Sequence, residues 1–113
     1  MQSFRQGDVV RVPFPYTDRS TRQHRPALVV STGGLGERRR LIWVAMITSA
    51  ENRPWPDDIP FGETHAEAGL PAPSIIRPCK MATIESVGAE KIGHVNAELM
   101  VKVIAFLRHA LSL

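Results

Sequence analysis

The chain has 113 residues, the length of one ordinary domain, and its 43% hydrophobic content is enough for a core. Charged residues make up 22%, close to the globular average, which argues against a disordered chain. The sequence shows no apolar run of membrane-spanning length, no apolar core of a secretory signal and a single cysteine, Cys79. We therefore expect a cytoplasmic protein without a disulfide or a cysteine-based metal site.

Charge is distributed unevenly along the chain, although the net charge is only +3. Residues 1–40 hold eight arginines against three acidic residues, a local balance of +5. Residues 51–70 hold five acidic residues against one arginine, a balance of −4. Eleven of the 14 basic residues are arginine, whose planar guanidinium binds phosphate through two parallel hydrogen bonds. This pattern favours a nucleic acid or another polyanion as partner, but an ordinary solvated surface would explain it equally well.

The first half of the chain predicts three strands. Residues 9–13 form a short β-rich run that ends in prolines, and residues 25–31 form a second, more apolar run. Between them, residues 16–24 are polar or turn-forming and predict an exposed loop. Residues 41–47 are almost continuously apolar, which predicts a central strand buried on both faces with Trp43 in the core. The three arginines that precede this strand are expected to be solvated residues that lead into it.

The second half begins with a segment of different composition. Residues 50–73 hold five prolines and the acidic cluster, so they predict a long functional loop. Residues 74–77, 81–87 and 91–95 are strand-like, and Pro78 requires a bulge or an edge position between the first two.

The chain closes with a predicted helix. Asn96 is a good N-cap, and the residues after it place apolar side chains on one wide face. This face is wider than packing on one sheet requires, so a dimer contact and a deep groove in the monomer both remain open. Taken together, the elements predict a mainly β protein, a small twisted β-barrel capped by a C-terminal helix.

Several blocks of the sequence, in their order, resemble the PemK/MazF family of bacterial toxins. The blocks are Gly7-Asp8-Val9-Val10, Pro13-Phe14, Thr17-Asp18, Arg25-Pro26-Ala27-Leu28-Val29-Val30-Ser31, Ile47-Thr48-Ser49 and Pro73-Ser74, followed by residues 80–84 and the C-terminal amphipathic helix. Together they cover almost the whole chain.

The resemblance implies a toxin of a type II toxin–antitoxin system, formed as a single SH3-like, PemK-type domain over residues 1–113. It implies a homodimer and an antitoxin partner whose acidic C-terminal tail covers the RNA groove. It further implies a sequence-specific, metal-independent endoribonuclease that cleaves single-stranded RNA without a cofactor. By position, Arg25 and Thr48 match the catalytic arginine and threonine of the family, and Ser49 and Ser74 are candidates for substrate contact.

Metal-independent cleavage of RNA uses the ribose 2′-hydroxyl as nucleophile and leaves a 2′,3′-cyclic phosphate and a 5′-hydroxyl. Arg25 can donate two hydrogen bonds to the phosphate oxygens, and Thr48 can add a hydroxyl donor from a strand end. Arginine is a poor general base near neutral pH, whereas histidine titrates close to it. His24 would supply that chemistry only from a bulge, because adjacent strand residues point to opposite faces. Its role as a proton carrier stays open.

Other side chains can contact the substrate. The indole of Trp55, between two prolines of the acidic segment, can stack on a base or simply hold the loop in place. The four histidines show no spacing typical of a metal site. The remaining candidates for substrate binding are Tyr16, Thr17, Arg19, Arg22 and Arg77.

Two other functions remain open on the same fold, because fold does not determine function. One is a gyrase-poisoning toxin of the CcdB type, which would leave RNA intact. The other is a regulator that binds nucleic acid, DNA included. The arginine and threonine blocks favour the nuclease.

Overall fold

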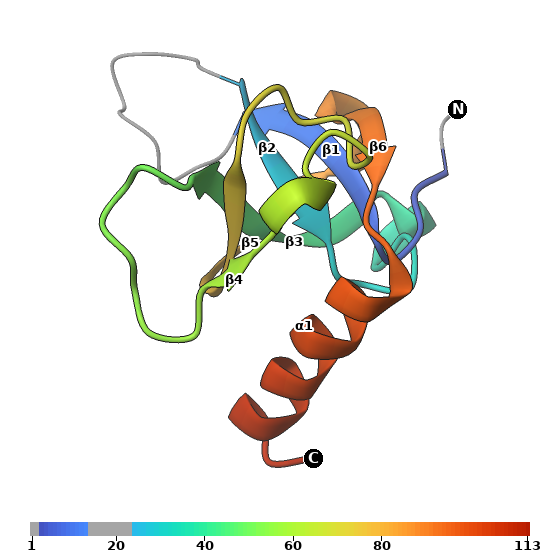
Figure 1. Ribbon diagram of the computed structural model, residues 1–113. Helices are drawn as coiled ribbons and strands as arrows, with labels where there is room; N and C mark the ends of the chain where they lie inside the picture. Colours follow the sequence, from blue (N-terminus) through green and yellow to red (C-terminus); the bar gives the residue numbers. More distant parts are fainter. Residues whose placement is uncertain (1–2, 14–23) are drawn as a thin grey trace.

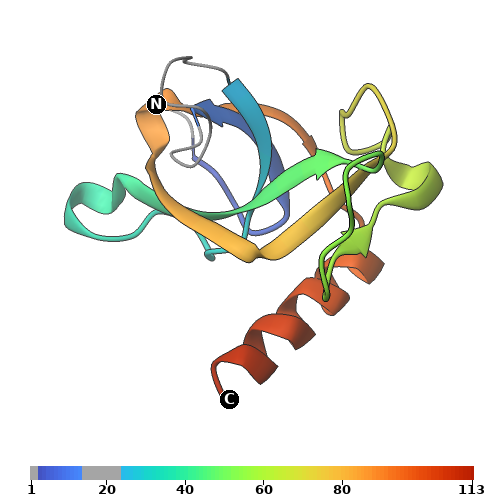
Figure 2. The ribbon, with the colours of Figure 1, turned by 90° about the vertical axis from the view of Figure 1, so that its left-hand side faces the viewer.

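The computed structural model describes residues 3–13 and 24–113. Within them, six strands form one antiparallel sheet in the order β4-β5-β3-β2-β1-β6, which curls into a half-barrel with the helix α1 against its outer face (Figures 1 and 2). The predicted mainly β fold with a C-terminal helix is confirmed. The elements are β1 (Asp8–Pro13), β2 (His24–Val29), β3 (Leu41–Ser49), β4 (Ile59–Pro60), β5 (Ser74–Glu85), β6 (Glu90–His94) and α1 (Ala97–Ala110), with 3-10 turns at Glu37–Arg39, Gly62–Thr64 and Ser86–Gly88.

A bulge at the predicted proline shapes the sheet. The two strands predicted at 74–77 and 81–87 are one long strand, β5, which pairs with β3 along its length. Met46 pairs with Arg77 and its neighbour Ala45 pairs with Met81, so residues 78–80 have no counterpart in β3. Proline lacks the N–H that a ladder needs, and a bulge increases the local bend and twist of a strand. The bulge therefore lies where β5 bends around the half-barrel.

Alternating side chains of the strands divide the core into two clusters. On one face of the sheet, Val9, Leu28 and Ile47 pack with Leu99 and Val103 of α1. The side chains that point the other way fill the inside of the half-barrel, because successive strand residues face opposite sides. This second cluster includes Phe4, Val10, Val12, Val29, Val44 and Ile84.

The N-terminus of α1 is capped as the sequence predicts. The side-chain oxygen of Asn96 accepts a hydrogen bond from the Leu99 amide at 2.8 Å, which satisfies one of the helix's first N–H groups. From there α1 runs across the sheet, and its C-terminal half leaves the sheet surface (Figure 2).

The prediction that Trp43 lies in the core is wrong. Its side chain is 51% exposed, on the face of β3 that α1 covers only in part. Because the helix leaves the sheet, a groove of about 690 Å³ opens there. Half-buried and exposed apolar side chains line this groove, among them Trp43, Met81, Phe106, Leu107 and Leu111.

The three arginines before β3 also differ from the expected strand lead. All three are solvated as predicted, but Arg38 and Arg39 belong to a 3-10 turn that projects from the barrel (Figure 2), and only Arg40, the residue after this turn, leads directly into β3. Arg38 and Arg39 have φ values of 57° and 54°, in the left-handed region.

Two glycines bring the segment after β4 against β6. A β-carbon at Gly93 would collide with the carbonyl of Ala68, and one at Gly69 would collide with the carbonyl of Ile92. Gly69 also has a φ of +83°, which favours glycine. This close contact holds the start of the 70–73 segment beside β6.

We expect the substitution Gly93→Ala to destabilise the fold by about 1–3 kcal/mol, because a methyl group there must push two backbones apart. Urea unfolding followed by circular dichroism measures the change. The matched control is Gly88→Ala, since the nearest atom to a β-carbon at Gly88 is 4.0 Å away. Equal stability of the two variants would show that the close contact does not constrain the fold.

Candidate functional site

An open cavity of about 740 Å³ lies at one end of the β2–β3 pair. The last paired residues at that end are Ala27 and Met46. Arg25 comes two residues before Ala27, and Thr48 comes two residues after Met46. Because β2 and β3 are antiparallel, both residues lie just beyond the same end of the paired region. Both residues line the cavity, and so do Ser49 and Ser74, which are paired across β3 and β5. The fold therefore brings four of the predicted site residues together.

The hydroxyl groups in the cavity differ in their contacts. Thr48 is only 6% exposed, and its Oγ1 accepts a hydrogen bond from the Asn52 amide group at 2.6 Å. The Ser74 hydroxyl donates to the Ala72 carbonyl at 2.8 Å. The Ser49 oxygen accepts from the Glu51 backbone amide at 3.1 Å. Since the Ser74 hydroxyl already donates its hydrogen bond to the backbone, Thr48 and Ser49 are the better placed hydroxyl donors.

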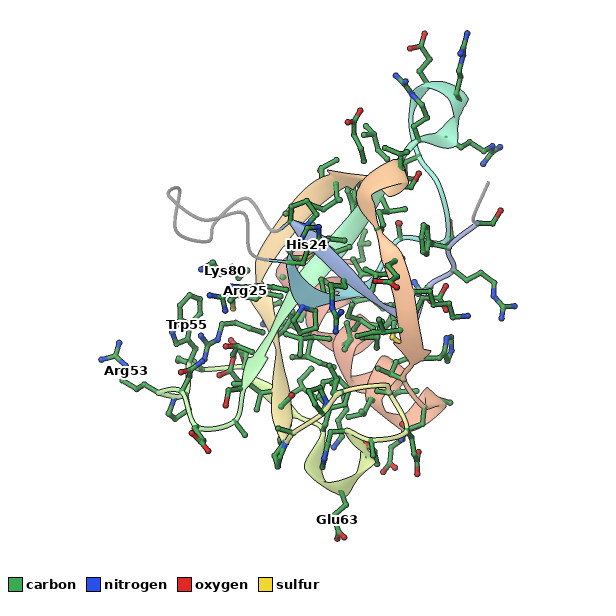
Figure 3. The ribbon with its side chains drawn as sticks, turned by 90° about the horizontal axis from the view of Figure 1, so that it is seen from above. His24, Arg25, Arg53, Trp55, Glu63 and Lys80 are labelled. Carbon is green, nitrogen blue, oxygen red and sulfur yellow. The ribbon has the colours of Figure 1, made fainter. Side chains whose placement is uncertain are left out.

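His24 lies at the cavity together with Arg25, although alternation along a strand predicts opposite faces. His24 is the first residue of β2 and is exposed. His24, Arg25 and Pro26 are consecutive, and all three line the cavity. The cavity therefore reaches around the end of β2 and contacts side chains on both faces of the strand. In Figure 3, His24 and Arg25 are on the same side of the barrel. No bulge is needed for them to share the cavity.

Trp55 and Arg77 lie beside this cavity rather than in its lining, and a buried ion pair holds them. The Arg77 guanidinium donates to both carboxylate oxygens of Asp58, at 3.1 and 3.0 Å, and the two side chains are only 7% and 8% exposed. Arg77 also donates to the Arg53 carbonyl at 3.0 Å. Its guanidinium carbon lies 4.2 Å from the centre of the Trp55 ring. We call Arg53, Trp55, Asp58 and Arg77 the loop clasp.

The contacts within the loop clasp limit which of its side-chain groups can bind a substrate. The Nε and Nη2 groups of Arg77 donate within the protein, and the residue is only 6% exposed, so little of it faces solvent for the predicted contact with substrate. Trp55 is 38% exposed, and the Lys80 ammonium lies 5.9 Å from its ring centre. Figure 3 shows Lys80, Trp55 and Arg53 on the same side of the molecule as Arg25. The predicted substrate residues Tyr16, Thr17, Arg19 and Arg22 lie outside the described residues.

Two buried carboxylates have lowered pKa values. Burial alone would raise the pKa of Asp58, but the hydrogen bonds from Arg77 and the Trp55 amide, with the charge of Arg77, bring it below its ordinary value of 3.8. Burial likewise opposes ionisation of Asp8, which is 1% exposed. Hydrogen bonds from the Arg5 amide, His94 and Lys91 outweigh burial and lower the pKa of Asp8. Both groups therefore stabilise the folded state in their ionised form.

The cavity also contains polar residues that sequence reasoning missed. Arg11 and Glu90 are cross-strand neighbours on β1 and β6, and both line the cavity with Asn52. Arg11 carried a signal, because it interrupts an apolar strand and is exposed there. Asn52 carried a weaker one, its position four residues after Thr48.

The described residues show neither a metal cluster nor a membrane helix. In residues 3–13 and 24–113, no three or more His, Cys, Asp or Glu side chains are grouped so as to hold a metal ion. No helix in the same ranges is long and apolar enough to cross a membrane.

We expect Asp58→Asn to destabilise the protein by about 3–5 kcal/mol, because it leaves the Arg77 charge buried without its partner. The ionised Asp58 stabilises the fold above pH 3.8, and this stabilisation is lost as pH falls through its lowered pKa. Urea midpoints of the wild type should thus fall steeply in acid, and those of Asp58→Asn less steeply. Asp57→Asn, an exposed neighbour with the same charge change, is the control and should stay within about 0.5 kcal/mol. A similar loss in both variants would contradict a specific role for the ion pair.

The sequence of the chain matches a family model, and its fold matches solved structures. Residues 5–111 match the family described as the PemK-like, MazF-like toxin of type II toxin-antitoxin system. None of the curated proteins matches the chain by sequence. Among solved structures, a MazE–MazF complex from Deinococcus radiodurans superposes with a TM-score of 0.76 at 19% identity, over 100% of this chain and 99% of the other.

Two mycobacterial structures show the same fold. An endoribonuclease in complex with its cognate antitoxin, from a mycobacterial species, gives a TM-score of 0.69 at 20% identity, over 97% of this chain and 96% of the other. The Mycobacterium tuberculosis toxin MazF-mt6 gives a TM-score of 0.66 at 19% identity, over 96% and 98%. With its sequence matched over almost its whole length, the chain belongs to the family of PemK-like, MazF-like toxins of type II toxin–antitoxin systems.

Proposed function

We propose that this toxin is a sequence-specific, metal-independent endoribonuclease that cleaves single-stranded RNA, messenger RNA included. Attack by the 2′-hydroxyl on the adjacent phosphorus would leave 2′,3′-cyclic phosphate and 5′-hydroxyl ends. The observation that carries the proposal is the cavity in which Arg25 and Thr48 meet at one end of the β2–β3 pair. Loss of messenger RNA would inhibit translation and arrest growth.

The roles of the two residues follow from their chemistry. In the transition state, negative charge grows on the phosphate oxygens, and fixed donors in a site shielded from water stabilise it most. Arg25 supplies a permanently charged, planar donor that matches two of those oxygens. Thr48 supplies a hydroxyl donor from the end of β3, where the surrounding core holds it.

His24 is the candidate proton carrier. It lines the same cavity as Arg25 and is exposed there, so substrate can reach its ring. An imidazole can accept the proton of the 2′-hydroxyl on its unprotonated nitrogen and then donate a proton to the leaving oxygen. The exposed Ser49 and Trp55 are candidates for holding the flanking nucleotides.

The surroundings of the cavity support an antitoxin partner. An acidic C-terminal tail of the cognate antitoxin would compete with RNA phosphates for Arg11 and Arg25, both of which line the cavity. Two of the solved relatives, the Deinococcus MazE–MazF structure and the mycobacterial endoribonuclease with its cognate antitoxin, are complexes. We propose the same kind of partner for this chain, in the cytoplasm.

The apolar groove beside α1 supports a homodimer. Trp43 and Leu111 are 51% and 65% exposed at this groove, and its apolar lining would gain from burial against a second copy. We propose that the surplus apolar face of the helix, part of which lines this groove, makes the contact with the second copy.

We expect Arg25→Ala to lower the cleavage rate by about 10²–10³-fold, because it removes the charged donor at the phosphate. The assay is cleavage of a defined single-stranded RNA in the presence of EDTA, with analysis of the product ends. Wild type should leave cyclic phosphate and 5′-hydroxyl ends. Arg108→Ala, an exposed arginine in the last turn of α1, is the control and should retain activity.

Three results would count against this proposal. The first is cleavage by Arg25→Ala at the wild-type rate, which would remove Arg25 from the mechanism. The second is loss of cleavage in EDTA, which would show dependence on a metal. The third is a protein that arrests growth when it is expressed while cellular RNA stays intact, which would favour a toxin that acts on gyrase.

We expect the wild type to be a dimer in solution and Leu111→Glu to shift it toward the 12.5 kDa monomer, because burying a charge in an apolar contact is costly. Size-exclusion chromatography with light scattering measures the mass. Val101→Glu is the control, since Val101 is 67% exposed on the same helix but outside the groove. A monomeric wild type, or dissociation by Val101→Glu alone, would rule out this groove as the dimer contact.

A further inference from the structure

We infer that Asn52 is a positioning residue that orients the Thr48 hydroxyl as a hydrogen-bond donor toward the scissile phosphate, and that the loop clasp holds Asn52 in place. This inference rests on the proposed ribonuclease function. It assigns a role to a residue of the 50–58 loop and to the ion pair beneath that loop.

The direction of the Asn52–Thr48 hydrogen bond carries the inference. The Asn52 side-chain nitrogen, Nδ2, is a donor and lies 2.6 Å from Thr48 Oγ1, so the threonine oxygen accepts. A hydroxyl group has one proton and two lone pairs. Because Asn52 occupies a lone pair, the proton of Thr48 remains to be donated elsewhere. The cavity is where that proton is of use, since both residues line it.

Thr48 by itself does not determine where its proton points. Its side chain is 6% exposed, and a β-branched residue is stiff at χ1, so the oxygen is well placed. The hydroxyl proton nevertheless rotates about the C–O bond. A donor fixed on one lone pair restricts that rotation, and a preorganised donor costs no reorganisation during the reaction.

The backbone around Asn52 is held on the side of β3. The Asn52 amide donates to the Ser49 carbonyl at 3.1 Å, and the Ala50 amide donates to the Pro73 carbonyl at 3.0 Å. These bonds form a turn directly after β3 and tie it to the segment that enters β5. The backbone at Asn52 therefore cannot shift away from β3 without breaking these hydrogen bonds.

The loop clasp holds the other side of Asn52. Arg77 donates to the carbonyl of Arg53, the next residue in the chain, and to both carboxylate oxygens of Asp58. The Trp55 amide in turn donates to Asp58 at 2.8 Å. Arg77 belongs to β5 and pairs with Met46 of β3, the strand that carries Thr48. One arginine thus connects the loop to the strand pair that places the hydroxyl.

The first test is kinetic. Asn52→Ala should lower kcat about tenfold with little change in KM, because it frees the hydroxyl without removing a phosphate contact. Asn52→Asp should lower kcat more, since a carboxylate would accept the hydrogen bond of the Thr48 hydroxyl and turn it away from the phosphate. Glu51→Gln, an exposed neighbour in the same turn, is the control and should behave as wild type. Wild-type kcat in either Asn52 variant would overturn the inference.

The second test asks whether Asn52 acts through Thr48. In the Thr48→Val background, where no hydroxyl remains, Asn52→Ala should cause no further loss of kcat. An equal tenfold loss in both backgrounds would mean that Asn52 acts by another route and would overturn the inference. Urea unfolding of Asn52→Ala identifies any loss caused by a changed fold.

The third test separates this inference from the proposed function. The side-chain amide resonances of Asn52 in a ¹H–¹⁵N spectrum should shift on Thr48→Val, and those of Asn96 should not. Unchanged Asn52 resonances would overturn the inference whatever the protein does to RNA. If the Asn52 resonances shift on Thr48→Val but the wild-type protein cleaves no RNA, the hydrogen bond exists and the proposed function is refuted. The catalytic role of the hydrogen bond is then refuted with it.

Discussion

The pairing of β3 with β5 is the constraint on which the rest of the site depends. Its register sets Ser49 opposite Ser74 at the cavity and Arg77 opposite Met46 behind the loop. The bulge that starts at Pro78 lets the same strand bend around the half-barrel without disturbing this end. A slip of one residue would turn every side chain of β5 to the other face and would separate Arg77 from the loop.

The acidic residues of the 51–70 segment affect the electrostatic field at the cavity less than their summed charge of −4 suggests. Asp58 is neutralised locally by Arg77, so this pair adds little to the field outside the protein. Asp57 and Glu63 remain exposed, and Glu63 lies at a tip far from Arg25 (Figure 3). The cavity thus keeps the influence of its own arginines, although a strongly acidic segment follows in the chain.

Local patterns predicted the elements well, and long-range contacts could not be read from them. The N-cap at Asn96 and the interruption at Pro78 depend on nearby residues, and both are confirmed. Trp43 was wrongly placed in the core, since its exposure depends on the angle at which α1 crosses the sheet. Arg77 and Asp58 are 19 residues apart, and no periodicity marks them as a pair. Likewise, the sequence placed Arg25 and Thr48 at strand ends, but the register that brings them to one cavity is a property of the sheet.

The positions of the two tryptophans give the protein separate optical reporters. Trp55 lies against the Arg77 guanidinium at the loop, while Trp43 lines the groove beside α1. An event that opens the loop would separate the indole of Trp55 from a fixed positive charge and leave Trp43 in its surroundings. Association at the groove would do the reverse. The fluorescence of each single-tryptophan variant can therefore follow one surface while the other is occupied, in a chain that needs no attached dye.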